Sequence, residues 1–316
     1  MHAGGHVVSE VTFLGLPATA LESLRPDEAD VAILGVPHGV PYPDPGLTTG
    51  CAEAPDAVRQ RSRRLASFAG HHDFDLDGPM LPPGSGLRIA DVGDVPGTPD
   101  DGAGNAARAQ GAVRSLLDAG VMPLIFGGDD SVPIPVLRAF AGRGPVCVVQ
   151  VDAHLDYRDE VAGVREGYSS TMRRIGEMEH VARVVQVGLR GVGSARSSDV
   201  ADARAAGNLL VTARQLRERG VPWLLAQLPM GMPIFLLFDV DALDPSVAPA
   251  VSGLSPGGLS YDLASDLVCG IAANHRLAGA AFTELVPALD ATGASALIVV
   301  RLAMLLLGAL ARRSEV

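Results

Sequence analysis

Short apolar runs alternate with amphipathic stretches along most of the chain, from about Val31 to the C-terminus. Runs of this length, bounded by turn residues, are typical of strands buried on both faces of a parallel sheet. We interpret the following segments as strands: Val31–Val36, Leu87–Ala90, Met122–Phe126, Val146–Val151, Val181–Val187, Leu209–Val211, Ile234–Phe238 and Leu277–Thr283. The segments predicted to be helical are Ala54–Ser67, Gly104–Ala119, Pro133–Phe140, Ser170–Met178, Ala213–Arg219, Pro222–Leu228 and Asp262–Ala273. This alternation predicts an α/β fold with helices on both faces of the sheet.

The pattern continues without a composition break that would mark a linker, so we expect residues 1–316 to form one large α/β domain. The most apolar stretch, Ala294–Leu310, is long enough to resemble a membrane span. Arg301 interrupts it near the middle, and two arginines follow it closely. We therefore interpret it as a terminal helix buried against the sheet.

Two acidic segments follow predicted strands directly and carry most of the chemical information. They read Asp-Ala-His-Leu-Asp, from Asp152 to Asp156, and Asp-Val-Asp, from Asp239 to Asp241. Residues two apart on a strand share a face, so Asp152, His154 and Asp156 converge if the extended geometry persists past the strand end. Four carboxylates and an imidazole in one place would repel one another and be costly to bury. A bound cation removes that cost, and this many anionic ligands suggests two divalent ions.

The ends of other predicted strands carry further candidate site residues, each of which could instead have a purely structural role. The Gly-Gly-Asp-Asp-Ser segment at Gly127 follows a strand and either joins the site through Asp130 or only caps the next helix. Glu284, after the last predicted strand, is either a solvated or capping residue or a contact for a cationic substrate. His38, after the first strand, is a candidate for the pocket wall. Asp244, which precedes a proline, is predicted to stabilise a turn.

Composition limits the partners. The formal charge of −11 argues against nucleic acid and anionic membranes as partners, and it is compatible with a small cationic substrate. Met1–Glu10 lacks a basic stretch followed by an apolar one, so no signal peptide is expected. The three cysteines are scattered and show neither a disulfide framework nor zinc-ligand spacing. These features favour a reducing, cytoplasmic location.

In order and spacing, the motifs resemble those of the arginase/agmatinase family, the ureohydrolases, in its agmatinase-like branch. The resemblance runs from the first strand to the terminal helix and includes Ala54–Arg59 and Pro256–Gly258. It implies a three-layer αβα sandwich around a mostly parallel, eight-stranded sheet. It also implies two divalent ions bridged by hydroxide, with Mn²⁺ expected first and Ni²⁺ as the alternative. Trimers or hexamers of one chain are implied as well.

The resemblance also implies roles for single residues. Asp152 and Asp239 would each touch both ions. Asp156 would complete the ligand set of one ion, and His154 and Asp241 would complete that of the other. Glu284 would occupy the place of a carboxylate that contacts a guanidinium group.

Two positions depart from the family pattern. Asp130 stands where the family carries a metal-ligating histidine, and we predict that it ligates through its carboxylate. This exchange makes the site one charge more negative, which favours hard ions. A second family histidine, a proposed proton shuttle, has no counterpart in Glu166–Met172, and Tyr168 is the nearest positional match.

Together these observations predict a metal-dependent amidinohydrolase that cleaves a guanidino or related amidine C–N bond and releases urea or a substituted urea. Asp156 is predicted to hydrogen-bond the nucleophile and relay a proton, while Glu284, Tyr168 and His38 are predicted to contact substrate. Two alternatives remain: a formimino-group hydrolase, and a non-catalytic subunit that assembles with a catalytic homologue.

Overall fold

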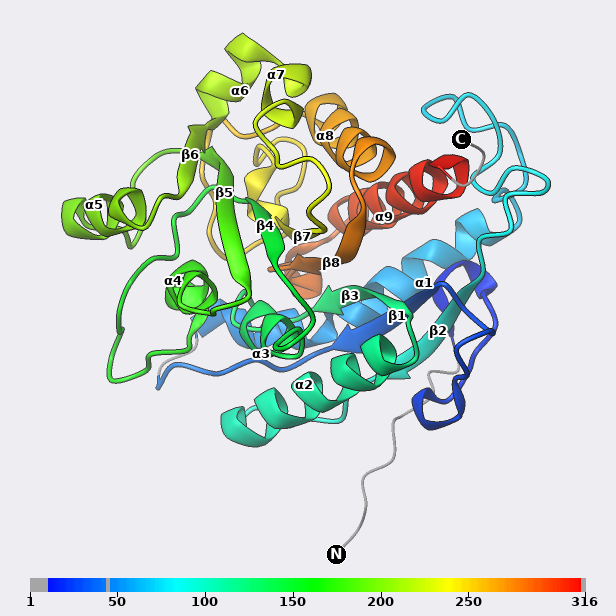
Figure 1. Ribbon diagram of the computed structural model, residues 1–316, viewed down its shortest axis with the longest axis horizontal. Helices are drawn as coiled ribbons and strands as arrows, with labels where there is room; N and C mark the ends of the chain where they lie inside the picture. The colour runs from blue at the N-terminus through cyan, green and yellow to red at the C-terminus, as the bar shows by residue number, and fades with distance from the viewer. Residues whose placement is uncertain (1–10, 44–45, 314–316) are drawn as a thin grey trace, which may run out of the picture.

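The computed structural model describes residues 11–43 and 46–313, and the expectation about Met1–Glu10 lies outside that part. Eight strands form one sheet in the order β2-β1-β3-β8-β7-β4-β5-β6, and every neighbouring pair is parallel. Figure 1 shows this twisted sheet running through the molecule, with helices packed along it. The predicted parallel α/β architecture is therefore confirmed.

The strands are β1 (Val31–Val36), β2 (Ile89–Asp94), β3 (Met122–Gly127), β4 (Val146–Val151), β5 (Val181–Leu189), β6 (Leu209–Thr212), β7 (Ile234–Asp239) and β8 (Leu277–Thr283). The α-helices are α1 (Ala54–Ala66), α2 (Gly102–Asp118), α3 (Pro133–Arg138), α4 (Thr171–Gly176), α5 (Ser197–Ala205), α6 (Ala213–Arg219), α7 (Val221–Leu225), α8 (Tyr261–Asn274) and α9 (Ala294–Arg313). Short 3₁₀ helices lie at Phe13–Gly15, Leu21–Ser23, Gly46–Glu53, Tyr168–Ser170, Val240–Ala242 and Pro287–Leu289.

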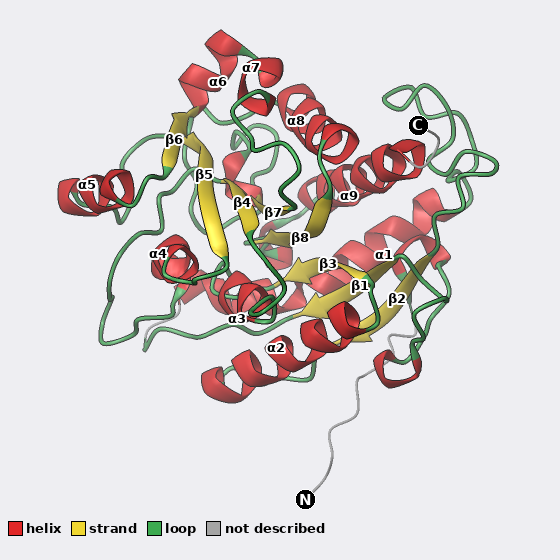
Figure 2. Cartoon of the chain, in the orientation of Figure 1, coloured by secondary structure: helices red, strands yellow, loops and turns green. Residues whose placement is uncertain are grey.

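The sheet buries both of its faces, so its strands read as continuous apolar runs. Alternate residues of each strand enter two separate cores; for example, Leu236 packs with one set of helices and Leu237 with the other. Helices α1, α6, α7, α8 and α9 cover the first face, and α2, α3, α4 and α5 cover the second. In Figure 2, α2 and α3 lie on one side of the sheet, and α8 and α9 lie on the other.

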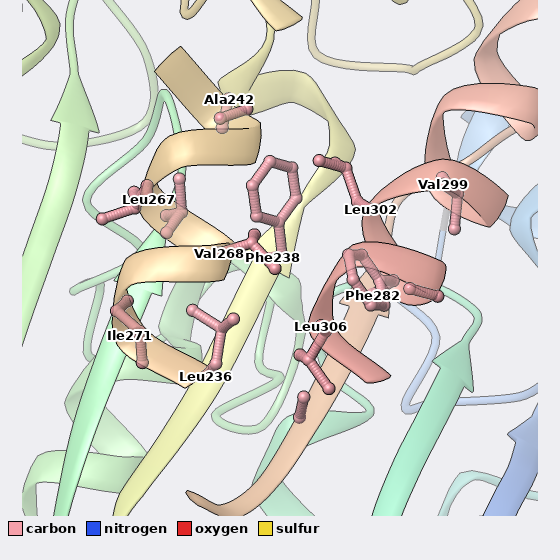
Figure 3. Packing of buried hydrophobic residues seen from close by; sticks show 14 of the residues in the cluster. Leu236, Phe238, Ala242, Leu267, Val268, Ile271, Phe282, Val299, Leu302 and Leu306 are labelled. Atoms are coloured by element: carbon pink, nitrogen blue, oxygen red, sulfur yellow. The ribbon is translucent and has the colours of Figure 1, made fainter. Parts of the chain in front are cut away.

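The first core is densest where α8 and α9 meet β7 and β8. Figure 3 shows Val268 of α8 and Leu302 of α9 on either side of Phe238, and Ile271 of α8 next to Leu236. Phe238 also lies 5.6 Å from Phe282, centroid to centroid. This packing fixes the ends of β7 and β8, from which two of the acidic segments emerge.

Helix α9 meets the length and composition expected of a membrane span, with a mean hydropathy of 2.3 in its most apolar window. However, 72% of that window is buried inside the fold, where it packs against α1 and α8. The prediction of a buried terminal helix is therefore confirmed.

Strand β2 differs from its predicted position, and the cause is a buried charge cluster. It begins two residues later than expected and continues through Asp91 to Asp94. The fully buried Arg59 of α1 donates to both carboxylate oxygens of Asp91, at 2.9 Å each, and to the Asp94 carboxylate at 2.5 Å. Asp91 also accepts the backbone N–H of Phe13 at 2.8 Å, which attaches the N-terminal segment to the sheet edge.

The Arg59→Met variant is expected to lower the free energy of unfolding by about 3–5 kcal/mol, because it leaves a buried carboxylate without its cation. Urea denaturation followed by circular dichroism measures the change. Arg63→Met, on an exposed position of the same helix, is the matched control and should shift stability by less than about 0.5 kcal/mol. Equal effects of the two substitutions would contradict this role for Arg59.

Candidate metal centre

The predicted metal ligands and Glu284 gather at the carboxyl ends of the four central strands, β3, β8, β7 and β4. Open parallel sheets bind ligands at this edge. A cavity of about 370 Å³ opens there, and its lining contains Asp130, His154, Asp156, Tyr168, Asp239, Asp241 and Glu284. Strands far apart in the sequence therefore deliver their terminal residues to one place.

Two groups of potential ligand atoms lie at the base of this cavity. One is Asp152 with His154 and Asp241, the other is Asp130 with Asp152 and Asp239, and within each group the atoms lie within 4.8 Å of one another. His154 Nδ1 is 2.9 Å from Asp241 Oδ2 and 3.6 Å from Asp152 Oδ1. Asp152, fully buried, belongs to both groups, which suits a carboxylate shared by two ions.

The side chains converge by turns and not by continued strand geometry, which corrects the expected alternation. β4 ends at Val151, after which Asp152 Oδ1 accepts the backbone N–H of His154 at 2.6 Å. Asp239 repeats this turn at the end of β7, accepting the N–H of Asp241 at 2.7 Å. Asp156 then has φ of 44°, in the left-handed region, and lines the cavity.

Three hydrogen-bonded amide side chains support Asp152 and Asp156. Gln150 Nε2 donates to Asp152 at 2.6 Å and to Asp156 at 3.3 Å. Its own oxygen accepts Gln186 Nε2 at 2.6 Å, and Gln186 in turn accepts Asn208 at 3.1 Å. The sequence analysis noted no role for Gln150, although one amide in an otherwise apolar strand is a visible signal. Such supporting groups orient metal-ligating carboxylates.

The electrostatics of the site fit a cation. Burial and then the charge of Asp152 raise the pKa of Asp130 and Asp156 well above the usual range. Burial and then the charge of Asp241 do the same for Asp239. Although burial opposes it, hydrogen bonds to Asp152 and Asp241 raise the pKa of His154 to about 11. Buried acids that shift one another this strongly are stabilised by bound divalent ions.

Asp130 faces this cluster. Its Oδ1 accepts the Thr283 hydroxyl at 3.0 Å, while its Oδ2 is buried and has no hydrogen-bond partner in the described part of the chain. Helix α3 starts after Val132 and has no side-chain cap, so the alternative that Asp130 or Ser131 caps this helix is wrong. An unpartnered carboxylate oxygen beside two other acids is a ready ligand atom.

Glu284 forms the wall next to Asp130. Its backbone is left-handed, with φ of 68°. Its two carboxylate oxygens accept the backbone N–H of Asp130 and the Ser252 hydroxyl, each at 2.8 Å. Burial and then the charge of Asp129 raise the pKa of Glu284 to about 8. The carboxylate is held at the cavity surface and is not a solvated strand-end residue.

Of the two other predicted substrate contacts, Tyr168 lines the cavity and His38 does not. Tyr168 lines the cavity, and its ring packs edge-on against Tyr42 with 4.6 Å between centroids. His38 lines a smaller neighbouring hollow that it shares with Asp129, so its predicted place in the main cavity is not supported. The reason is local: its ring packs so closely on Gly97 that a Cβ there would come within 2.8 Å of it.

Two glycines that the sequence analysis did not single out enclose His154. A Cβ added to Gly193 would stand 2.8 Å from the imidazole Cδ2. A Cβ added to Gly253 would stand 2.8 Å from both the imidazole Cε1 and the Asp241 carboxylate. The loops that carry these glycines can therefore close tightly over the ring.

Asp244 has the structural role that its Asp-Pro context predicted. Its carboxylate accepts the backbone N–H and hydroxyl of Ser246 at 3.0 and 2.6 Å, and the N–H groups of Gly257 and Gly258 at 2.8 and 3.0 Å. Hydrogen bonds from Ser246 lower the pKa of Asp244 to about 2. The residue joins the loop after β7 to the Gly257 turn, outside the cavity lining.

Comparison with known proteins agrees with this geometry. The sequence model of the arginase family matches residues 29–308. The chain is 32% identical over 295 residues to guanidinopropionase of Pseudomonas aeruginosa, covering 91% of this chain and 87% of the relative. It is 32% identical over 287 residues to agmatinase of Salmonella paratyphi B, covering 88% and 86%.

Among solved structures, proclavaminate amidino hydrolase from Streptomyces clavuligerus superposes with a TM-score of 0.84 at 27% identity, covering 96% of this chain and 98% of that one. Enzymes of the arginase family contain binuclear metal centres, and the acidic groups described above are able to bind such ions. From its fold, its site and these relatives, the chain belongs to the arginase family, whose members hydrolyse C–N bonds of guanidino compounds.

Proposed function

We propose that this protein is a two-metal amidinohydrolase that cleaves a guanidino C–N bond of a small cationic substrate and releases urea or a substituted urea. The observation that carries the proposal is the pair of overlapping ligand groups that share Asp152 at the base of one cavity. Glu284 adds a carboxylate to the wall of the same cavity, where it suits a guanidinium group.

The two groups, together with the family resemblance that adds Asp156, indicate which residues would hold the ions. Asp130 and Asp156 would be ligands of one ion, and His154 and Asp241 would be ligands of the other. Asp152 and Asp239 would be ligands of both ions. Five carboxylates and one imidazole form an oxygen-rich set, which favours Mn²⁺, with Ni²⁺ as the alternative. When bound, the two ions supply Lewis acidity and a nucleophilic hydroxide at neutral pH.

The chain's own groups orient the reaction. The Glu284 carboxylate binds the guanidinium N–H groups and presents the central carbon to the base of the cavity. Asp156, beside Asp152, would accept a hydrogen bond from the nucleophile and would relay a proton toward the departing amine. Gln150 holds the Asp156 carboxylate in place through the 3.3 Å contact at Oδ2.

The Glu284→Gln variant is expected to raise KM about tenfold or more, because a charge-assisted hydrogen bond becomes a neutral one. Metal content should stay at the wild-type level, since glutamine still accepts the N–H of Asp130. Steady-state urea release and elemental analysis measure both quantities. Glu179→Gln, at an exposed position, serves as the matched control. An unchanged KM would remove Glu284 from substrate recognition.

A urea-release screen over guanidines and amidines, with metal analysis of the same sample, tests the whole proposal. Urea release by a chain that contains two ions supports it. Formamide as the product would favour a formimino-group hydrolase instead. A chain with neither bound metal nor activity would favour a non-catalytic subunit that assembles with a homologue.

We further propose a homo-oligomer, a trimer or hexamer, as in the family the sequence resembles, and a cytoplasmic location. The three cysteines, which are free thiols, support a reducing compartment. Size-exclusion chromatography with light scattering tests the assembly, and cell fractionation tests the location.

A further inference from the structure

We propose that the cavity selects guanidinium substrates whose tail is uncharged and apolar, and that Tyr168 is the residue that recognises the cation's flat face. This inference rests on the proposed function and names its substrate class. Three observations carry it: an aromatic wall, two exposed apolar residues that adjoin the cavity lining in sequence, and arginines that are already engaged.

The aromatic wall consists of Tyr168 and Tyr42. Tyr168 lines the cavity together with Glu284 and is packed edge-on against Tyr42 at 4.6 Å and 69°. Burial and then the neighbouring Tyr42 raise the pKa of Tyr168 to about 12, so its phenol stays neutral. A neutral ring beside a carboxylate can hold a planar cation through its face while the carboxylate binds the cation's edge.

Several contacts hold the aromatic wall against its neighbours. The Tyr42 hydroxyl accepts the backbone N–H of Ser169 at 3.2 Å. Gly167 lies so close to Tyr42 that a Cβ there would stand 2.3 Å from the ring. Arg138 binds the carboxylate of Glu166, at 2.9 and 2.5 Å, and so attaches the same loop to α3. The ring of Tyr168 is therefore presented on a preorganised loop.

Two exposed apolar residues, Val192 and Leu254, are sequence neighbours of residues that line the cavity. Val192 is 97% exposed and precedes Gly193, which lines the cavity. Leu254 is 55% exposed and follows Gly253, which also lines it. Both glycines lie close to His154, so Val192 and Leu254 belong to the two loops that flank this residue. Exposed apolar side chains beside a binding cavity suit an apolar ligand tail.

Among the described residues, no arginine lines the cavity where an acidic tail would lie. The chain contains no lysine, every arginine lies among the described residues, and none of those arginines lines the cavity. Arg158 donates to the carbonyl of Ser194 at 3.1 Å. Arg190 donates to the carbonyls of Asp241 and Ser255 among others. Arg204 and Arg190 line a neighbouring hollow that shares His154, Gly193 and Ser194 with the cavity. A substrate carboxylate would therefore have no arginine in the cavity lining to pair with.

Three substrates of matched length test the preference on the metal-loaded wild type: n-butylguanidine, 4-guanidinobutyrate and agmatine. The expected result is a kcat/KM for n-butylguanidine at least about tenfold above the other two. A higher value for either charged compound would overturn the inference while leaving the proposed function intact. Urea release from none of the three, nor from guanidine itself, would overturn both.

Variants at Tyr168 separate recognition from folding. Tyr168→Phe retains the ring and should keep KM for n-butylguanidine within about twofold. Tyr168→Leu should raise KM by about tenfold with kcat nearly retained, since the cation's contact with the ring face is lost. Equal KM values for the two variants would remove Tyr168 from cation recognition.

A variant designed to gain activity on a carboxylate substrate tests the position of Val192 beside the cavity. Val192→Arg should raise the kcat/KM ratio of 4-guanidinobutyrate to n-butylguanidine by about two- to fivefold, because it supplies the missing counter-ion. Met230→Arg, at a position 81% exposed and outside the cavity lining, should leave the ratio unchanged. Arg204→Ala should leave it unchanged as well. A fall in 4-guanidinobutyrate activity in that variant would show that the tail reaches Arg204 and would overturn the inference.

Discussion

The Asp152→Asn variant is expected to lose urea release completely and to weaken metal binding by more than about 100-fold. Asp152 is fully buried and is the one residue common to both ligand groups. Its Oδ1 accepts the N–H of His154 and its Oδ2 accepts Gln150, so the carboxylate has a fixed orientation. An amide in that place supplies only one ligand oxygen and removes a charge that would be shared by two ions.

Elemental analysis and isothermal titration with Mn²⁺ measure the loss, and circular dichroism checks the fold. Asp239→Asn should behave in the same way, since Asp239 ends β7 with the same kind of turn. Asp101→Asn is the matched control, because Asp101 caps α2 in an exposed position and asparagine caps helices equally well. Full occupancy of both ions in Asp152→Asn would contradict the shared-ligand assignment.

Much of the sheet was predictable because its strands are buried on both faces. The bounds of β4 and β8 agree with the apolar runs Val146–Val151 and Leu277–Thr283 residue by residue. Helix α5, at Ser197–Ala205, was not predicted, because it buries little apart from Ala203 and therefore has no apolar stripe. Strand β2 was misplaced because a sequence does not show that Asp91 and Asp94 are neutralised by an arginine from another element.

For the site, the sequence predicted which residues meet but not how they meet. Strand-end aspartates could be assigned to one edge from the parallel topology alone. The turns at Asp152 and Asp239 and the left-handed backbone at Asp156 depend on local hydrogen bonds that alternation does not describe. The position of Ser252 against Glu284, more than thirty residues away, depends on tertiary packing, so no local motif predicts it.

Substitution of Asp130 is expected to have the second large effect, on metal content and metal preference. At this position the chain departs most from the pattern of the family that it resembles. Asp130 shares a ligand group with Asp152 and Asp239. Its Oδ1 accepts the Thr283 hydroxyl, and its Oδ2 is buried and has no partner among the described residues. If that oxygen ligates, Asp130→Ala should reduce the content from two ions to one per chain, since one ion loses a charged ligand.

Asp130→His should keep two ions but shift the preference from Mn²⁺ toward nitrogen-favouring ions such as Ni²⁺ and Zn²⁺, by about tenfold or more. Competitive loading with equal concentrations of the metals, followed by elemental analysis, measures this shift without relying on activity. Thr283→Val is a graded comparison: it removes the hydroxyl that orients Asp130 and should weaken metal binding less than Asp130→Ala does.

Because α3 has no side-chain cap, none of these substitutions should cost helix stability through capping. The free energy of unfolding in urea, measured on the metal-free variants, should therefore remain near that of the metal-free wild type. Two ions per chain in Asp130→Ala, with the wild-type metal preference, would show that Asp130 is not a ligand and that the remaining carboxylates and His154 complete the centre alone.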